Sequence, residues 1–128
     1  MEYFHLSESN WNNKVFYPRV PYSIMDGEDQ KTKRVCVSTC IPGCIRALVN
    51  GYMFDECTLY VHVPLDYKGR VHKPSKKEVP DVIETREKWL LDKVRMKCIG
   101  VIRVRKTDKP DPYNSHEKMF KYKWIEKY

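Results

Sequence analysis

Short stretches of alternating apolar and polar residues recur along this chain. The three clearest lie at 34–38, 58–64 and 98–104, and each is rich in β-branched or aromatic side chains. Neighbouring side chains of a strand point to opposite faces of a sheet, so this pattern is typical of strands. We therefore predict three central strands, a short strand at 3–6, and a final strand at 119–125, where aromatic and basic residues alternate.

One segment has the spacing of a helix instead. Pro42 suits the first helical turn, because its nitrogen has no hydrogen that would stay unpaired there, and Thr39 can cap that turn. We predict a helix over 42–49. Four apolar residues fall on one face of it: Ile41, Ile45, Leu48 and Val49. Residues 83–91 fit either a helix or an extended strand, and the sequence leaves both open.

The composition favours a domain built from sheets. Valine (13) and isoleucine (7) far outnumber leucine (6) and alanine (1), whereas a helical bundle would be rich in good helix formers. The segments 17–34 and 65–80 are long, polar and contain prolines, as functional loops often do. We expect a single α+β domain over 1–128, with mostly antiparallel strands in two small sheets around a cleft and one or two short helices. Residues 105–128 form either a basic C-terminal extension or a final strand that follows a polar linker at 105–118.

The net charge of +7 is unevenly distributed. Residues 1–64 carry 6 basic and 7 acidic side chains, whereas residues 65–128 carry 18 and 10. A row of lysines can contact phosphates, so the second half predicts an acidic partner, either a nucleic acid or an acidic protein. The lysines that alternate with aromatic residues at 118–127 also fit an ordinary strand with its aromatic face turned inward.

Other features of the sequence disfavour several classes of protein. No apolar run approaches the roughly 20 residues that span a bilayer, and the first residues lack the basic and apolar regions of a secretory signal. The five cysteines include no Cys-x-x-Cys pair, so we expect no metal site and thiols that stay reduced. We therefore expect a cytoplasmic protein that does not contact a membrane.

The order of the elements, with the residues they carry, resembles a known family. The first strand ends in His5-Leu6-Ser7, the second is followed by Ser38-Thr39 and a short helix, and the third reads Leu-Tyr-Val-His-Val-Pro over 59–64. Acidic residues follow at 84–87. This series resembles the small ADP-ribosyltransferase fold, most closely the rifampin ADP-ribosyltransferase family. Members of that family begin with a His-Gly-Thr-like motif and contain a strand of Val-Tyr-Val-x-Pro character. The resemblance covers residues 3–104.

The resemblance implies that the chain binds NAD as a substrate and transfers ADP-ribose to an acceptor. His5 would bind the ribose on the nicotinamide side, and Ser38 or Thr39 would lie near the nicotinamide. Arg19 would meet the pyrophosphate, because a guanidinium pairs bidentately with phosphate oxygens. In full, the residues assigned to NAD binding are His5, Ser7, Arg19, Ser38, Thr39 and Tyr60.

The same resemblance implies a catalytic carboxylate late in the chain. It would stabilise the oxocarbenium-like ribose as nicotinamide leaves. Glu87 is the first candidate, Glu84 the second and Asp81 the third, and His5 completes the catalytic set. The alternative for all three acidic residues is a solvated charged stretch with no role in a site.

Two positions depart from the family pattern. Leu6 stands where the family has a glycine after the first histidine, and Cys36 stands where it has an aromatic residue that stacks on nicotinamide. An alternative is therefore a pseudoenzyme, a non-catalytic module that binds nucleic acid, a nucleotide or an acidic protein through its basic second half. A small accessory protein that acts through protein contacts alone is a third possibility. Whether the chain is an enzyme stays open at this point.

Overall fold

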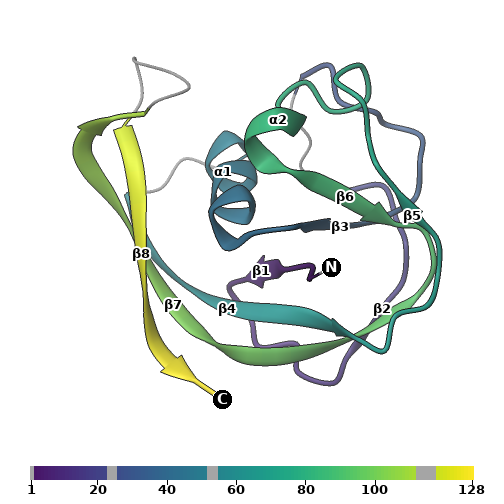
Figure 1. Cartoon of the computed structure of the whole chain (residues 1–128), viewed down its shortest axis with the longest axis horizontal. Helices are drawn as coiled ribbons and strands as arrows, with labels where there is room; N and C mark the ends of the chain where they lie inside the picture. Colours follow the sequence, from purple (N-terminus) through teal and green to yellow (C-terminus); the bar gives the residue numbers. More distant parts are fainter. Residues whose placement is uncertain (1, 23–25, 52–54, 112–117) are drawn as a thin grey trace.

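Two antiparallel sheets make up most of the protein, whose computed structural model describes residues 2–22, 26–51, 55–111 and 118–128. The larger sheet curves around the smaller sheet and helix α1 (Figure 1). It has the strand order β1-β4-β7-β2, and β8 pairs with β7. Its strands are β1 His5–Ser7, β2 Val15–Phe16, β4 Glu56–Leu65, β7 Val94–Pro110 and β8 Lys118–Lys127.

The smaller sheet has the strand order β3-β6-β5. Its strands are β3 Val35–Ser38, β5 Val71–His72 and β6 Glu87–Leu90. All pairings in both sheets are antiparallel. Together with two helices, they confirm the predicted α+β class with mostly antiparallel strands.

Helix α1, Ile41–Gly51, packs its apolar face on the larger sheet. The predicted helix is confirmed, but its first turn is capped differently from our expectation. The Gly43 amide donates a hydrogen bond to the Cys40 Sγ at 3.4 Å, so Cys40 rather than Thr39 occupies the capping position. The core beneath the helix joins α1 to three strands: Leu6, Ile41, Cys44, Ile45, Val49, Leu59, Val61, Ile102 and Val104.

A second core cluster draws its side chains from both sheets. It consists of Val35, Val37, Leu90, Val94 and Met96. Since side chains alternate along a strand, the inward valines of β3 and the inward leucine of β6 leave their neighbours on the opposite face of the smaller sheet. Ser38 of β3 and Glu87 of β6 therefore lie on that opposite face, whereas Lys88 shares the face of Leu90.

Strand β1 hydrogen-bonds to both sheets. Along one edge it pairs with β4, where His5 lies opposite His62. On its other side, the Phe4 amide donates to the Ser38 carbonyl at 2.8 Å, and the Ser38 amide donates back to the Phe4 carbonyl at 3.0 Å. Since β1 is the element that touches β4 and β3 at once, it fixes His5 beside the smaller sheet.

A β-bulge in β7 lies beside His62, the β4 residue that pairs with His5. The register between β4 and β7 shifts after Val61, which pairs with Gly100, so that His62 pairs with Cys98. Gly100 has φ of +152°, and a Cβ there would collide with the Glu126 carbonyl. The bulge therefore requires glycine at this position.

Most sequence-based strand predictions are confirmed. The stretches 34–38, 58–64 and 98–104 form β3, β4 and part of β7, and 119–125 lies within β8. The ambiguous segment 83–91 contains both alternatives in succession. Helix α2, Val82–Thr85, is followed at once by β6.

Two predictions about loops were wrong. The segment 65–80 contains β5, and the linker predicted at 105–118 is strand as far as Pro110. Residues 112–117 of that linker lie outside the described residues. In both places the strand forms by pairing with a neighbouring strand. The segment itself has no alternation of apolar and polar residues from which a strand could be predicted.

We predict that Ile102→Ala lowers the free energy of unfolding by about 2–5 kcal/mol, because it leaves a cavity under α1. Ile102 has no exposed surface. The matched control is Ile83→Ala, since the Ile83 side chain is 60 % exposed and its loss changes the free energy by less than about 0.5 kcal/mol. Urea denaturation followed by circular dichroism measures both. Equal losses in the two variants would contradict the described core.

Candidate functional site

Three of the predicted site residues lie on three neighbouring strands. His5 is on β1, Ser38 on β3 and Glu87 on β6. Phe4 lies opposite Ser38, and Ser38 lies opposite Glu87, so one row of residues crosses the three strands. His5 is one position along from that row. The fold thus brings together residues that are 33 and 49 positions apart in the sequence.

The Glu87 carboxyl is buried at the start of β6. Glu87 is only 8 % exposed, and this burial raises the pKa of its carboxyl from the ordinary value of 4.5 to about 7. The Trp89 indole Nε1 donates a hydrogen bond to the Glu87 Oε2 at 2.6 Å, which favours the ionised form and lowers that pKa in part. At neutral pH the carboxyl therefore populates both protonation states.

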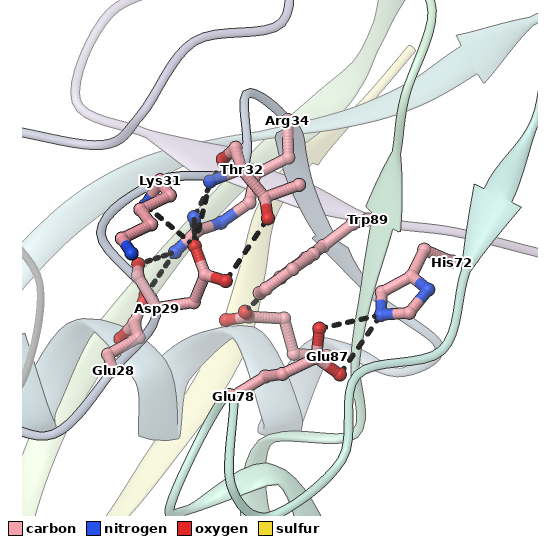
Figure 2. A network of polar contacts seen from close by, with 9 residues as sticks. All are labelled: Glu28, Asp29, Lys31, Thr32, Arg34, His72, Glu78, Glu87 and Trp89. Carbon is pink, nitrogen blue, oxygen red and sulfur yellow. Dashed lines mark hydrogen bonds and ion pairs between the residues drawn. The ribbon is translucent and has the colours of Figure 1, made fainter.

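Arg34 covers the face of the smaller sheet that carries Glu87 and Trp89, but it does not neutralise Glu87. Its guanidinium lies 4.1 Å from the centroid of the Trp89 ring, and its side chain is fully buried. Figure 2 shows the guanidinium turned toward two acidic residues of the preceding loop. Its Nη2 is 2.8 Å from the Glu28 Oε2, and its Nη1 is 3.4 Å from the Asp29 Oδ1.

Those two carboxylates explain why Glu87 keeps a raised pKa beside a cation. Amide hydrogen bonds from Thr32 and Lys31 lower the pKa of Asp29, so that side chain stays ionised next to Arg34. The Arg34 charge is therefore matched within its own loop, and its effect on the pKa of Glu87 is smaller than the effect of burial.

Ser38 holds the corner between α2 and β6, where the chain turns at Arg86 and Glu87 begins the strand. The Ser38 hydroxyl donates to the Thr85 carbonyl at 2.6 Å, and the Glu87 amide donates to the Thr85 Oγ1 at 3.3 Å. Arg86, between them, ends α2 in the left-handed conformation with φ of 53°. A Cβ at Gly43 would collide with the Thr85 carbonyl and the Ser38 hydroxyl, so glycine lets α1 approach this corner.

The His5 imidazole is neutral at physiological pH. Burial lowers the pKa of His5 from 6.5 to about 4. Its Nδ1 is 3.1 Å from the Cys36 carbonyl, and because a carbonyl only accepts, Nδ1 carries the proton and Nε2 is left as an acceptor. The ring makes an edge contact with Phe16 at 5.1 Å between centroids and lies 6.1 Å from the His62 ring.

The structure places the remaining NAD-binding candidates around β1 and the loop before β3. The Arg19 backbone forms a bridge with Arg34, while its guanidinium lies 4.4 Å from the Tyr22 ring. The Ser7 Oγ accepts a hydrogen bond from the Trp11 indole at 2.8 Å. Tyr60 pairs with Ser7 across β1 and β4.

The other candidates lie on or just after β3, and in or just before α2. Thr39 follows β3 and is half-buried. Glu84 belongs to the four-residue helix α2 and is half-buried, and Asp81 immediately precedes that helix. Cys36 lies on β3, and burial raises the pKa of its thiol to about 12, so this thiol stays protonated. All five cysteines are free.

Several residues of this region were not singled out from the sequence. Trp89 and Arg34 are the two largest fully buried side chains among the described residues. His72 on β5 stacks on Trp89 at 5.3 Å between centroids, and its Nε2 is 3.0 Å from the Glu78 carboxylate (Figure 2). The spacing of Glu87 and Trp89 was the available signal, because residues two apart share a face of a strand.

Two surface hollows lie away from this row of residues. The first, on β4, β7 and β8, is lined by Glu56, Arg103, Arg105, Lys121, Tyr122, Lys123 and Ile125. The second lies near β2 and the start of β7, and includes Val15, Tyr17, Tyr67, Lys93 and Arg95. Within the described ranges there is no cluster of three or more metal-ligating side chains. No helix among those residues is long and apolar enough to cross a membrane.

No model of a protein family, no curated protein and no solved structure matches this chain.

We predict that Trp89→Phe raises the pKa of Glu87 above about 7, because phenylalanine keeps a ring under Arg34 but removes the indole donor. A carbon-detected NMR titration of the side-chain carboxyl measures the change. Trp11→Phe is the matched control, since the Trp11 indole donates to Ser7 instead. An unchanged Glu87 titration in Trp89→Phe would contradict the described hydrogen bond.

We also predict that Glu87→Gln stabilises the protein increasingly as the pH rises from 4.5 to above 7. Because the folded pKa of Glu87 lies above its ordinary value, ionisation of this carboxyl disfavours the folded state of the wild type. At pH 8 the variant gains about 2–3 kcal/mol in the free energy of unfolding. A constant difference between Glu87→Gln and wild type across the pH range would refute the raised pKa.

Proposed function

We propose that the chain is an ADP-ribosyltransferase-like protein that binds NAD where β1, β3 and β6 meet. The observation that carries this proposal is that His5, Ser38 and Glu87 lie on three neighbouring strands, with Ser38 paired to both Phe4 and Glu87. The family resemblance assigns these same three residues to the ribose, the nicotinamide and the catalytic carboxylate. Two of them also have pKa values moved strongly by burial, as functional groups often do.

Each of the three residues has a chemical role in this proposal. The neutral His5 ring keeps Nδ1 on the Cys36 carbonyl, so its Nε2 accepts a hydrogen bond from a ribose hydroxyl. The ionised form of Glu87 stabilises positive charge on the ribose. Ser38 is a positioning residue, because its hydroxyl holds the Thr85 carbonyl at the corner that leads into β6.

The proposed reaction breaks the bond between the ribose C1′ and the nicotinamide nitrogen. The bonding electrons pass to the nicotinamide, which leaves as a neutral molecule, and the ribose becomes an oxocarbenium-like cation beside the Glu87 carboxylate. The oxygen or nitrogen of an acceptor then bonds to C1′ and loses its proton to solvent. With water as the acceptor, NAD⁺ and water give ADP-ribose, nicotinamide and one proton.

A second candidate is a module that binds NAD without transferring ADP-ribose. The burial of Glu87 favours it, because a carboxyl that is 8 % exposed and engaged by Trp89 is poorly placed to meet a ribose. Under the first proposal, the loop that carries Glu28 and Asp29 has to move aside when NAD binds. Under the second, NAD contacts His5 and the neighbouring backbone while that loop stays in place.

Incubation with NAD labelled in the nicotinamide, followed by chromatography, tests the proposal. We expect release of free nicotinamide by the wild type and by Glu84→Gln, and release at least about 100-fold slower by Glu87→Gln, because a single charge-stabilising group contributes that much. Thermal shift with NAD is measured on all three proteins.

Each outcome of this experiment decides between the candidates. An NAD-dependent thermal shift without nicotinamide release supports the non-catalytic module and contradicts the transferase. Neither release nor a shift contradicts both. Equal release by Glu84→Gln and Glu87→Gln would show that Glu87 is not the catalytic carboxylate.

A further inference from the structure

Four cations form two like-charged pairs on the outer face of β7 and β8. Arg103 lies directly opposite Lys123, and Arg105 lies directly opposite Lys121. All four side chains are exposed. Like charges that face each other across two strands destabilise a sheet, so this arrangement costs stability when nothing binds to it.

The neighbouring strand supplies little compensating charge. The Glu56 carboxylate on β4 forms an ion pair with Arg103, with 2.9 Å between the Arg103 Nε and the Glu56 Oε1. In the part of the chain that the structure describes, Arg105, Lys121 and Lys123 have no ion-pair partner. By contrast, Lys127 at the end of β8 lies 5.0 Å from the centroid of the Trp124 ring.

The folding of these strands does not require cations at the four positions. The opposite face of the hairpin carries the core, where Ile102 and Val104 are buried and Phe120 and Trp124 pack against them. Any polar side chain at the outward positions would satisfy that alternation. Arg103 bonds to Glu56 and Thr58 on β4, whereas packing asks only for polar side chains at the other three positions. Together the four cations line a surface hollow with Tyr122 and Ile125.

We propose that this face, defined by Arg103, Arg105, Lys121 and Lys123, binds the backbone of a single-stranded nucleic acid. Side chains on one face of a strand repeat about every 6.6 Å, and neighbouring strands lie about 4.8 Å apart. The array is thus a narrow strip two cations wide, which suits one sugar–phosphate backbone. Ile125 also lines this hollow and is 54 % exposed, so it offers apolar surface beside the cations.

A nucleic acid fits this strip better than an acidic protein does. Arginine and lysine contact phosphates regardless of base sequence, and evenly spaced phosphates meet evenly spaced cations. This face is separate from the proposed NAD site, because His5, Ser38 and Glu87 do not line the hollow.

Fluorescence anisotropy with labelled oligothymidylate and oligouridylate tests this proposal between about 50 and 200 mM salt. Single strands lose affinity with a slope of about −0.7 per phosphate contact in a plot of log K against log salt, so four contacts give about −2.8. In the double variant Lys121→Gln/Lys123→Gln the slope falls in magnitude by about 1.4. The control is Lys76→Gln/Lys77→Gln, which removes the same charge from an exposed turn elsewhere.

We expect the control to bind like the wild type, and circular dichroism to show that both double variants are folded. Equal weakening in the two variants would overturn the proposal, because only the net charge would then matter. If the wild type bound neither oligonucleotide, the proposal would be overturned as well. Binding of polyglutamate at least as tight as that of the oligonucleotides would assign the face to an acidic protein instead.

Discussion

The pair of backbone hydrogen bonds between Phe4 and Ser38 joins the two sheets, and the rest of the site depends on it. These bonds attach β1 to β3 while β1 also pairs with β4. They set His5 beside the smaller sheet, and Ser38 extends the connection through its hydroxyl to Thr85 and so to the start of β6. A single short strand thereby determines how His5 and Glu87 lie relative to one another.

Burial acts on the two ionisable groups of the site in the same physical sense. It favours the uncharged form of each, so the pKa of His5 falls to about 4 and that of Glu87 rises to about 7. Arg34 does not reverse this, because Glu28 and Asp29 already match its charge. The β7–β8 face is different, since its four cations are exposed to water. The molecule therefore separates a desolvated site from a solvated, strongly charged surface.

Sequence patterns were sufficient where a segment carries its own signal. The β-branched runs of β3, β4 and β7 and the helical spacing of α1 predicted these elements. Strand β5 and the polar end of β7 were missed because they form only by pairing with neighbours. The contact of Arg34 with Trp89 was missed because it depends on the path of the loop before β3, which alternation does not encode.

An NMR titration of the protein with NAD, following the ring nitrogens of His5 and the indole proton of Trp89, tests whether NAD binds at β1, β3 and β6. We expect saturable shifts of both signals, because NAD would meet the His5 Nε2 and would alter the carboxyl that the Trp89 indole contacts. The backbone signals of Arg103 and Lys121 should stay unchanged. Shifts confined to the β7–β8 face, with His5 and Trp89 unmoved at saturation, would contradict the claim that these strands form the NAD site.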